Sequence, residues 1–357
     1  MFIINVYQTY LYILKIIIIS LEMKIKNELN YYNRYYYLKC INIYIIILLI
    51  IFETPFYNNY NFCLMCANKN FNDYRCNDCS VANIFTGLKI VSKEETLNEI
   101  IINKKSITRF GDGEYRLIFG ENAGLQKYNE TLAKRLLDIL NSDEKNLLIG
   151  INIPYKKKDL DERSDASKGM WKSYFRGNKL KIARIINKKK IYYSALISRF
   201  YSTFKDRTNS LKYIFYFKKI WNNRDVLIIE GEKTRVGIGN DLLNNSKSIK
   251  RILCPNVNAF NVYEKIISYV KHFDKNVLIL IALGPTATVL AYDLYKLNYQ
   301  VVDIGHIDIE YELYLRKAKH MISIPSKLVF EAAGGTSNIS NVTDINYYNQ
   351  IAFKVLN

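Results

Sequence analysis

The stretch VLILIALGPTATVLAYDLYKLNYQVVDI at residues 277–304 decides the fold class. It opens with seven apolar residues, which a glycine and a proline end. Residues 286–297 then have a helical pattern, and a second apolar run follows at residues 301–304. Short apolar runs bounded by turn residues are typical of buried parallel strands, which a helix connects. The stretch therefore predicts a strand–helix–strand unit of an α/β protein.

The same alternation extends over the chain from about residue 92 onward. The other predicted strands are residues 106–110, 147–153 and 226–229, the other predicted helices are residues 92–103, 131–140 and 262–272, and residues 168–221 are expected to be mostly helical. No internal repeat or low-complexity linker divides residues 92–357. We expect one α/β domain with a mainly parallel central sheet at 92–357, preceded by an irregular hydrophobic N-terminal extension at 1–91.

The chain is long enough for a substantial core and is strongly basic. Its 357 residues are 49% hydrophobic, and 51 Lys and Arg against 33 Asp and Glu give a net charge of +18. This excess favours anionic partners such as phosphorylated small molecules, anionic lipids or nucleic acid. No nucleic-acid-binding motif is recognisable, and the lysine runs at 156–158 and 188–190 are interpreted as solvated, so nucleic acid is not expected as a partner.

A hydrophobic segment at residues 35–52 bears on the location of the protein. Its 18 positions, interrupted by Lys39 and Asn42, are close to the lower limit for crossing a bilayer. A peripheral amphipathic anchor and a later start, at Met23 or Met65, are the alternatives. We expect a cytoplasmic domain associated with the inner face of the membrane through this segment.

Two CxxC pairs follow this segment. Cys63 and Cys66 are separated by nine residues from Cys76 and Cys79, a tight version of the spacing seen in zinc knuckles. A structural zinc site and a coincidence of free thiols both remain open. Neither alternative gives these cysteines a role in catalysis.

Two acidic clusters stand out against the positive charge. RFGDGE at residues 109–114 and DIGHIDIEYE at residues 303–312 each follow an apolar run, and the second holds one of only three histidines. Hard divalent cations prefer oxygen ligands, to which one imidazole can be added. These ligands usually come from different segments of the chain that meet in the fold. If residues 303–312 are extended, their alternation places His306 and three carboxylates on one face. If they are helical, these side chains scatter around the axis.

Two further segments follow predicted strands, where open α/β sheets bind ligands. The turn at residues 283–288 opens a helix, with Thr286 or Thr288 able to cap it, and is either a phosphate site or an ordinary turn. Residues 230–241 combine glycines, a threonine and an arginine suited to a nucleotide. They lack the third glycine of a dinucleotide fingerprint, and no P-loop motif exists, which weakens dehydrogenase and P-loop interpretations.

Together these segments resemble the GT-D type of glycosyltransferases, a family first known as a domain of unknown function and found in bacterial glycan and adhesin glycosylation. The matching strings, in order across residues 106–312, are SITRFGDGE, LISRF, IEGEKTRVGIGNDLL, ILCPNVNAF, LGPTATVLAYDL and VDIGHIDIEYE. One departure is Phe200, where the family leads us to expect a proline after Arg199. The first ninety residues have no counterpart.

The resemblance implies a Rossmann-like α/β fold and the use of a nucleotide sugar with Mn²⁺ or Mg²⁺. The family's D-x-E motif falls on Asp112 and Glu114, and His306 is implied to join them at the metal. Glu312 is the implied candidate base, with Asp308 close enough to compete. The expected donor-binding residues are Arg109, Arg199, Glu232, Arg235, Asn258, Gly284, Pro285 and Thr286.

The expected activity is inverting transfer of a hexose, with glucose as first choice, from a UDP-sugar to a glycan or glycoprotein acceptor. Cleavage of the donor leaves negative charge on the diphosphate, which a cation and arginines can offset. A metal-dependent phosphohydrolase acting on phosphate esters and a non-catalytic nucleotide-sugar-binding module are the alternatives. All three interpretations of the acidic clusters require the two clusters to meet in the folded chain.

Overall fold

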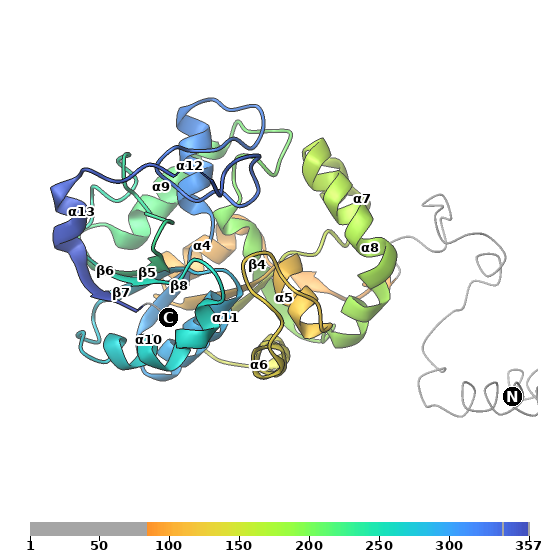
Figure 1. Ribbon diagram of the computed structural model, residues 1–357. Helices are drawn as coiled ribbons and strands as arrows, with labels where there is room; N and C mark the ends of the chain where they lie inside the picture. The colour runs from red at the N-terminus through yellow and green to blue at the C-terminus, as the bar shows by residue number, and fades with distance from the viewer. Residues whose placement is uncertain (1–83, 338, 356–357) are drawn as a thin grey trace, which may run out of the picture. The chain divides into compact units, whose positions relative to one another are not determined.

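A computed structural model describes residues 84–337 and 339–355 (Figure 1). The predictions for residues 1–83, including the hydrophobic segment and the four cysteines, lie outside these residues. Each strand pair in the described sheet is parallel. The strands are β1 (Lys89–Ile90), β2 (Ser106–Phe110), β3 (Leu147–Ile151), β4 (Ile191–Ser194), β5 (Asp225–Gly231), β6 (Ser248–Cys254), β7 (Leu278–Ala282), β8 (Gln300–Asp303) and β9 (Ile351–Lys354), in the order β1-β4-β3-β2-β8-β7-β5-β6-β9.

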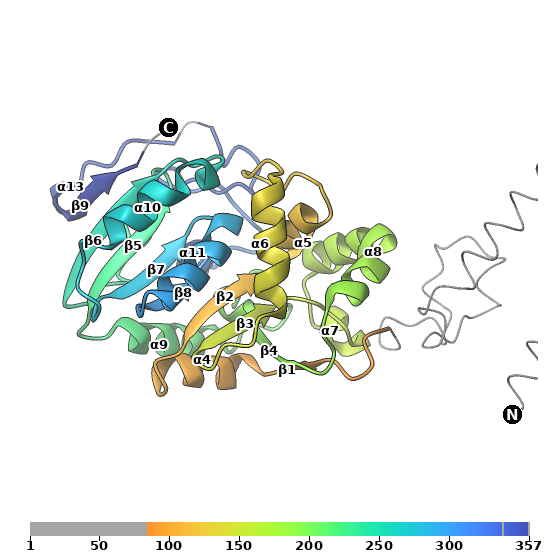
Figure 2. The same cartoon turned by 90° about the horizontal axis from the view of Figure 1, so that it is seen from below.

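Helices cover both faces of the sheet, as expected for buried parallel strands. The α-helices are α4 (Lys93–Ile101), α5 (Asp112–Ile118), α6 (Glu130–Asn141), α7 (Lys157–Asp161), α8 (Asp165–Ile185), α9 (Ser210–Trp221), α10 (Tyr263–Val270), α11 (Pro285–Lys296), α12 (Ile307–Leu315) and α13 (Ile345–Gln350), with 3₁₀ turns η3 (Ala195–Ser198) and η4 (Ala259–Val262). One core lies between the sheet and α6, α8, α10 and α11, and the other between the sheet and α4, α9 and α12 (Figures 1 and 2). Strand residues alternate between them, so Leu227 packs in the first core and Ile228 in the second.

The α/β class and the mainly parallel sheet are confirmed. The predicted strands coincide with β2, β3, β5, β7 and β8. Residues 168–221 are mostly helical, as expected, but they also contain β4, four residues of mixed exposure whose pattern is too short to detect. β6 was not assigned to a strand either. The sheet also begins with β1, slightly before the predicted domain start at residue 92.

The turn before α11 corrects one detail of the capping prediction. Gly284 is the N-cap, with a φ of 54° that favours glycine, and Pro285 fills the first helical position. The hydroxyl of Thr288 instead donates to the carbonyl of Arg109 at 2.9 Å, and that of Thr286 lies 3.3 Å from Oε1 of Gln126. Neither threonine caps the helix. Pro285 has no N–H and the N–H of Ala287 donates to the carbonyl of Gly284 at 2.9 Å, which leaves the N–H of Thr286 without a backbone partner among the described residues.

The central strand order positions the site. β8 lies between β2 and β7, and Ile107 of β2 pairs with Val302 of β8. Two strands far apart in the sequence therefore end side by side at the carboxyl edge of the sheet. None of the helices within the described residues is long and apolar enough to cross a membrane.

Candidate active site

Arg109 joins the ends of the two central strands. Its Nη2 donates to Oδ1 of Asp303 at 2.7 Å and its Nε to the carbonyl of Asp303 at 2.8 Å. Its Nη1 donates to Oγ of Ser198, after β4, at 2.6 Å. Gly305 makes room for this guanidinium, because a Cβ there would lie 1.9 Å from Nη2. Arg109 thus ties β2, β8 and η3 together, which brings the two acidic clusters side by side.

The carboxylates of the first cluster lie at the start of α5 and differ in accessibility. Oε2 of Glu114 accepts from the backbone N–H of Gly111 at 2.6 Å. Burial, with the negative charges of Asp303 and Asp112 adding to it, raises the pKa of Glu114 to about 7. The side chain of Asp112 is 41% exposed. Asp112 is therefore the more open carboxylate of the cluster, and Glu114 the more confined.

The second cluster is helical beyond residue 306, so the helical alternative for residues 303–312 is correct. His306 is the N-cap of α12, and its Nε2 lies 3.6 Å from Oε1 of Glu331. Burial and the positive charges of Arg199 and Arg109 lower the pKa of His306 to about 4, although 41% of its side chain stays exposed. The imidazole is therefore neutral near pH 7 and can offer a lone pair.

The two candidate bases, Asp308 and Glu312, lie away from His306 around a buried lysine. Nζ of Lys327 lies 2.6 Å from Oδ2 of Asp308 and 3.3 Å from Oε1 of Glu312. Nδ2 of Asn240 donates to both carboxylates, at 2.9 and 2.6 Å, and the N–H of Gly237 donates to Asp308. Asp308 and Glu312 are each 2% exposed. In this arrangement both are engaged in a buried ionic network.

Glu331 is a further residue of the site that the sequence did not indicate. Its carboxylate accepts from both terminal nitrogens of Arg199, with one contact of 2.8 Å, and Arg199 lies 3.8 Å from Glu310. Burial would raise the pKa of Glu331, but the charges of Arg199 and His306 hold it well below the usual range. Glu331 is 132 positions from Arg199 in the sequence, so no local sequence pattern indicates that the two residues pair.

Several of the expected donor-binding residues surround a small cavity at the carboxyl ends of β5 and β7. Gly284, Pro285 and Asn258 line this space of about 70 Å³, together with Leu328, and Thr286 is buried nearby. A Cβ placed on Gly113 would lie 3.7 Å from Cγ of Pro285. The cavity therefore adjoins the Asp112–Glu114 turn. The acidic turn thus packs against the start of α11, whose Gly284 and Pro285 line the cavity.

Arg235 and Glu232, which were also expected to bind the donor, do not line this cavity. Nη1 of Arg235 donates to the carbonyls of Ser326 and Ser340, at 2.7 and 2.6 Å, and holds these two segments together. Glu232 follows β5 and is half-buried, with no side-chain hydrogen bond or ion pair to the residues that the structure describes. Arg109 and Arg199 are thus paired with groups of the protein, whereas Nε of Arg235 is buried without a hydrogen-bond partner among the residues that the structure describes.

The accessible ligands fit a divalent cation that also takes phosphate oxygens. Within residues 84–337 and 339–355, no three His, Cys, Asp or Glu side chains are placed to hold a metal ion by themselves. Mg²⁺ is commonly held by one or two carboxylates plus substrate phosphates instead of an all-protein cage. Asp112 and His306, partly exposed and next to neighbouring strand ends, supply an oxygen and a neutral nitrogen for that mode of binding, and Oδ2 of Asp112 lies 3.6 Å from Nε of Arg116.

The chain is similar to known proteins over this region. A family model described as the glycosyltransferase GT-D fold matches residues 107–332. The chain is 34% identical over 270 residues to glycosyltransferase GlyD of Streptococcus pneumoniae serotype 4, covering 76% of this chain and 33% of that protein. It is 37% identical over 243 residues to the probable glycosyl transferase Gly of Streptococcus gordonii, covering 67% and 35%. The chain therefore spans about a third of the length of these curated relatives.

Solved structures agree with this match. The highly conserved domain of unknown function 1792, which has a distinct glycosyltransferase fold, superposes with a TM-score of 0.72 at 34% identity and covers 78% of this chain and 98% of its own. A glycosyltransferase with the same domain from Streptococcus sanguinis superposes with a TM-score of 0.71 at 33% identity, covering 75% and 99%.

Proposed function

Because the chain belongs to the glycosyltransferase family with the GT-D fold, we propose that its cleft transfers a hexose, with glucose as first choice, from a UDP-sugar to a glycan or glycoprotein acceptor with inversion. The observation that carries this proposal is the meeting of the two acidic clusters through Arg109, beside the turn that opens α11. Anion-binding groups and acidic groups in one cleft suit a donor whose leaving group is a diphosphate.

Positive groups on two sides of the cleft support diphosphate binding. The N–H of Thr286 lies in the first turn of α11, where the helix dipole favours an anion. Arg199 offers a planar guanidinium once Glu331 leaves it. A cavity of about 70 Å³ is far below the roughly 300–1,000 Å³ of small-molecule sites. Donor binding therefore includes displacement of the segment that carries Leu328 and Glu331.

For the cofactor we propose Mn²⁺ or Mg²⁺, held by Asp112, Glu114 and His306 together with the donor. When bound, the cation would offset negative charge on the departing diphosphate. Asp112 is accessible for this role, and the neutral imidazole of His306 avoids charge repulsion. The raised pKa of Glu114 means that a nearby positive charge would favour its ionised form.

For the base we retain Glu312, with Asp308 as its competitor. A base must come within hydrogen-bond reach of the acceptor hydroxyl, directly or through one water. Both carboxylates pair with Lys327. Since Lys327 belongs to the same segment as Leu328 and Glu331, displacement of that segment by the donor would also release these carboxylates. We place the reaction in the cytoplasm, at the inner face of the membrane through residues 35–52, because activated sugars are cytosolic.

Donor turnover by the full-length chain tests the proposal. The protein is incubated with Mn²⁺ and a panel of nucleotide sugars, and diphosphate release is followed with and without glycan acceptors. Asp112→Asn should abolish metal-dependent donor hydrolysis, and Asp138→Asn, an exposed carboxylate on α6, should not. Full activity of the Asp112 variant would refute the assignment. Phosphate release from simple esters would indicate a phosphohydrolase, and binding without turnover a non-catalytic module.

A further inference from the structure

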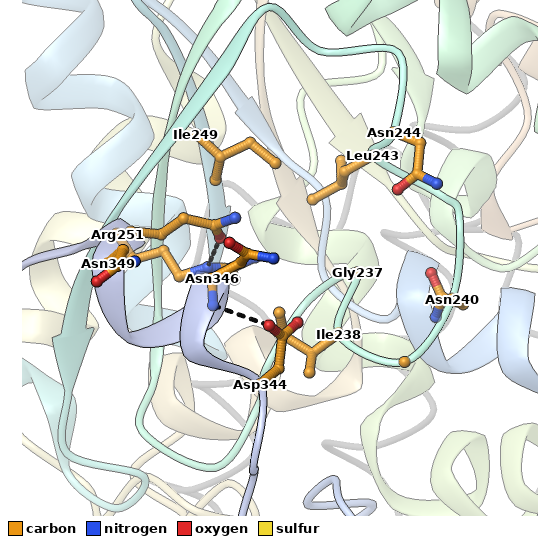
Figure 3. A pocket seen from close by; sticks show the side chains of 12 residues that line it. Gly237, Ile238, Asn240, Leu243, Asn244, Ile249, Arg251, Asp344, Asn346 and Asn349 are labelled. Carbon is orange, nitrogen blue, oxygen red and sulfur yellow. Dashed lines mark hydrogen bonds between the residues drawn. The ribbon is translucent and has the colours of Figure 1, made fainter.

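A second and larger cavity lies apart from the cleft. It has a volume of about 720 Å³ and is bounded by the loop at residues 237–244, the first half of β6 and helix α13 (Figure 3). None of its lining residues lines the small cavity at Gly284. Its volume is in the range of about 300–1,000 Å³ that is typical of small-molecule sites. The proposed reaction uses no group in it.

Side-chain amides dominate the polar wall of this cavity. They are Asn240, Asn244, Asn346, Asn349 and Gln350. Figure 3 shows Asn240 and Asn244 on one side and Asn346 and Asn349 on the other. The side chains of Asn244, Asn346 and Asn349 are exposed and make no hydrogen bond to any residue that the structure describes. An amide donates and accepts at once, as a sugar hydroxyl does, so this wall matches a polyhydroxylated ligand.

The charged groups of the wall are already used within the protein. Arg251 is 1% exposed, and its three nitrogens donate to Gln350, Glu230 and the carbonyl of Val236, at 2.7, 2.5 and 2.9 Å. Asp344 accepts from the backbone N–H of Asn346 at 2.8 Å and caps α13. An anionic ligand would find no unpaired cation here. The wall therefore favours a neutral ligand over a phosphate or a nucleotide.

Apolar side chains complete the cavity. Leu243 lines it but is only 3% exposed, so the apolar surface within reach of a ligand comes from Ile238 and Ile249, which are half-buried (Figure 3). Sugar rings expose C–H faces as well as hydroxyls, so a saccharide can bury its apolar faces on these side chains while its rim bonds to amides. Amides with intervening apolar surface thus fit a saccharide better than a purely apolar or a charged ligand.

The cavity also contacts the reaction cleft through its wall. Asn240 lines the cavity and donates to Asp308 and Glu312, and Gly237, another lining residue, donates to Asp308. These carboxylates lie on α12, whose N-cap is His306. A ligand that reorients Asn240 would change the hydrogen bonding of the candidate bases.

We propose that this cavity is a subsite for a neutral oligosaccharide, and that it holds a non-reacting part of the glycan acceptor. The identification of that saccharide as the acceptor rests on the proposed glycosyl transfer, whereas the binding itself does not. Because the wall offers no unpaired cation, it suits the charged donor poorly, and the donor is proposed to bind in the cleft at Gly284.

Saturation-transfer NMR on the full-length chain, without donor, tests the binding. The probes are maltotriose, cellotriose, lactose and chitotriose, which are all neutral. At least one should bind with a dissociation constant on the order of 1 mM. Asn346→Ala combined with Asn349→Ala should weaken it at least about tenfold, a loss of about 1.4 kcal/mol. Ile345→Ala, on the same helix but outside the cavity, should leave binding unchanged. Binding of none of the four, or undiminished binding by the double variant, overturns the proposal.

Two further measurements separate this site from the cleft. UDP should not displace the bound oligosaccharide, because the two ligands occupy different cavities, and competition would overturn the proposal. Donor hydrolysis without acceptor should be the same in the double variant and the unmodified protein, and its loss would contradict a separate site. If the unmodified protein turns over no donor, the proposed transfer fails, while the NMR result still decides whether the cavity binds saccharide.

Discussion

Arginines expected to bind the donor are also the side chains that hold the cleft together. The side chains of Arg109 and Asp303 are 14% and 5% exposed. Breaking such a buried pair leaves an uncompensated charge, which costs far more than the loss of a surface ion pair. Arg109 therefore stabilises the fold through its pair with Asp303, whether or not it also contacts the donor.

Replacing Arg109 with Met should lower the free energy of unfolding by about 3–5 kcal/mol, since Asp303 would remain buried without its partner. Urea unfolding followed by circular dichroism measures the change. The control is Lys158→Met, which removes an ion pair whose side chains are 81% and 53% exposed, and should cost less than about 1 kcal/mol. Equal stability of the Arg109 variant and the unmodified protein would show that Asp303 is satisfied in another way.

Lys93, at the start of α4, predicts a pH dependence of stability. Its Nζ lies 4.0 Å from the ring centre of Phe204 and 4.3 Å from that of Tyr213. Burial lowers the pKa of Lys93 from 10.5 to about 8; the nearby carboxylates of Glu94, Glu162 and Glu310 oppose this shift, and Arg163 adds to it. Between pH 8 and 10.5 the unfolded chain therefore binds more protons at this position than the folded chain.

The contribution of Lys93 should make the free energy of unfolding rise with pH from about 8 to 10.5, because stability increases wherever the unfolded state binds more protons. Lys93→Met should remove this part of the rise. Denaturant unfolding at several pH values measures it, with Lys134→Met, an exposed lysine of α6, as the control. An unchanged slope in the Lys93 variant would contradict the shifted titration.

Among the larger elements, the segment at residues 324–335 borders the small cavity and pairs with Arg199 and with the carboxylates of α12. Leu328 lines the small cavity, and Phe330 lies 3.3 Å from the position of a Cβ on Gly124. Glu331 pairs with Arg199, and Lys327 pairs with the carboxylates of α12. The segment thus closes the cleft over its length and places a carboxylate where the donor's diphosphate is proposed to bind.

Glu331→Gln should lower the KM for the nucleotide sugar about three- to tenfold with little change in kcat, because the diphosphate would no longer compete with a carboxylate for Arg199. Steady-state donor hydrolysis measures both constants. The control is Glu99→Gln at the end of α4, whose ion pair with Lys105 has comparable exposure, 30% and 22%. A rise in KM would mean that Glu331 assists donor binding instead of competing with it.

The helix α12 shows why sequence periodicity was not sufficient at residues 303–312. Seven consecutive residues of α12, 307–313, are buried, including three carboxylates. A helix buried on all sides loses the apolar stripe that identifies a surface helix. Its alternation of apolar and acidic residues therefore imitates a strand, although Asp308 and Glu312 share Lys327 and Asn240 while Glu310 accepts from Ser202.

Over the whole molecule, β1 extends the domain beyond its expected start. Lys89 and Ile90 pair with Ile191 and Tyr192 of β4 at the edge of the sheet. Phe85 is 1% exposed and lies against Phe175, with ring centres 6.4 Å apart. Residues before 92 therefore contribute to the core.

A fragment of residues 92–357 should be less stable than one of residues 84–357 by at least about 3 kcal/mol, because burial of Phe85 and Leu88 contributes about 1.5–3 kcal/mol for each side chain. Urea unfolding of the two fragments gives the difference. Coincident unfolding curves would show that the first strand adds nothing to the domain.

The α/β class, five of the strands and the residues at their ends could be read from local patterns. Buried parallel strands require short apolar runs, and turns require glycine and proline, so RFGDGE and GPT were identified at strand ends. β4 is too short and too exposed for such a pattern. Glu331 and Lys327 carried no signal, because their roles depend on partners elsewhere in the chain.

The local sequence pattern of apolar runs and turn residues thus determined which chemical groups lie at the carboxyl edge of the sheet. The placement of β8 beside β2 decided which of them share a cleft, because strand order is a long-range property. The same packing left Asp112 partly exposed beside Arg116 and enclosed Asp308 and Glu312 around Lys327. Whether a carboxylate is free or paired depends on the charges packed against it, and segments distant in the sequence supply those charges.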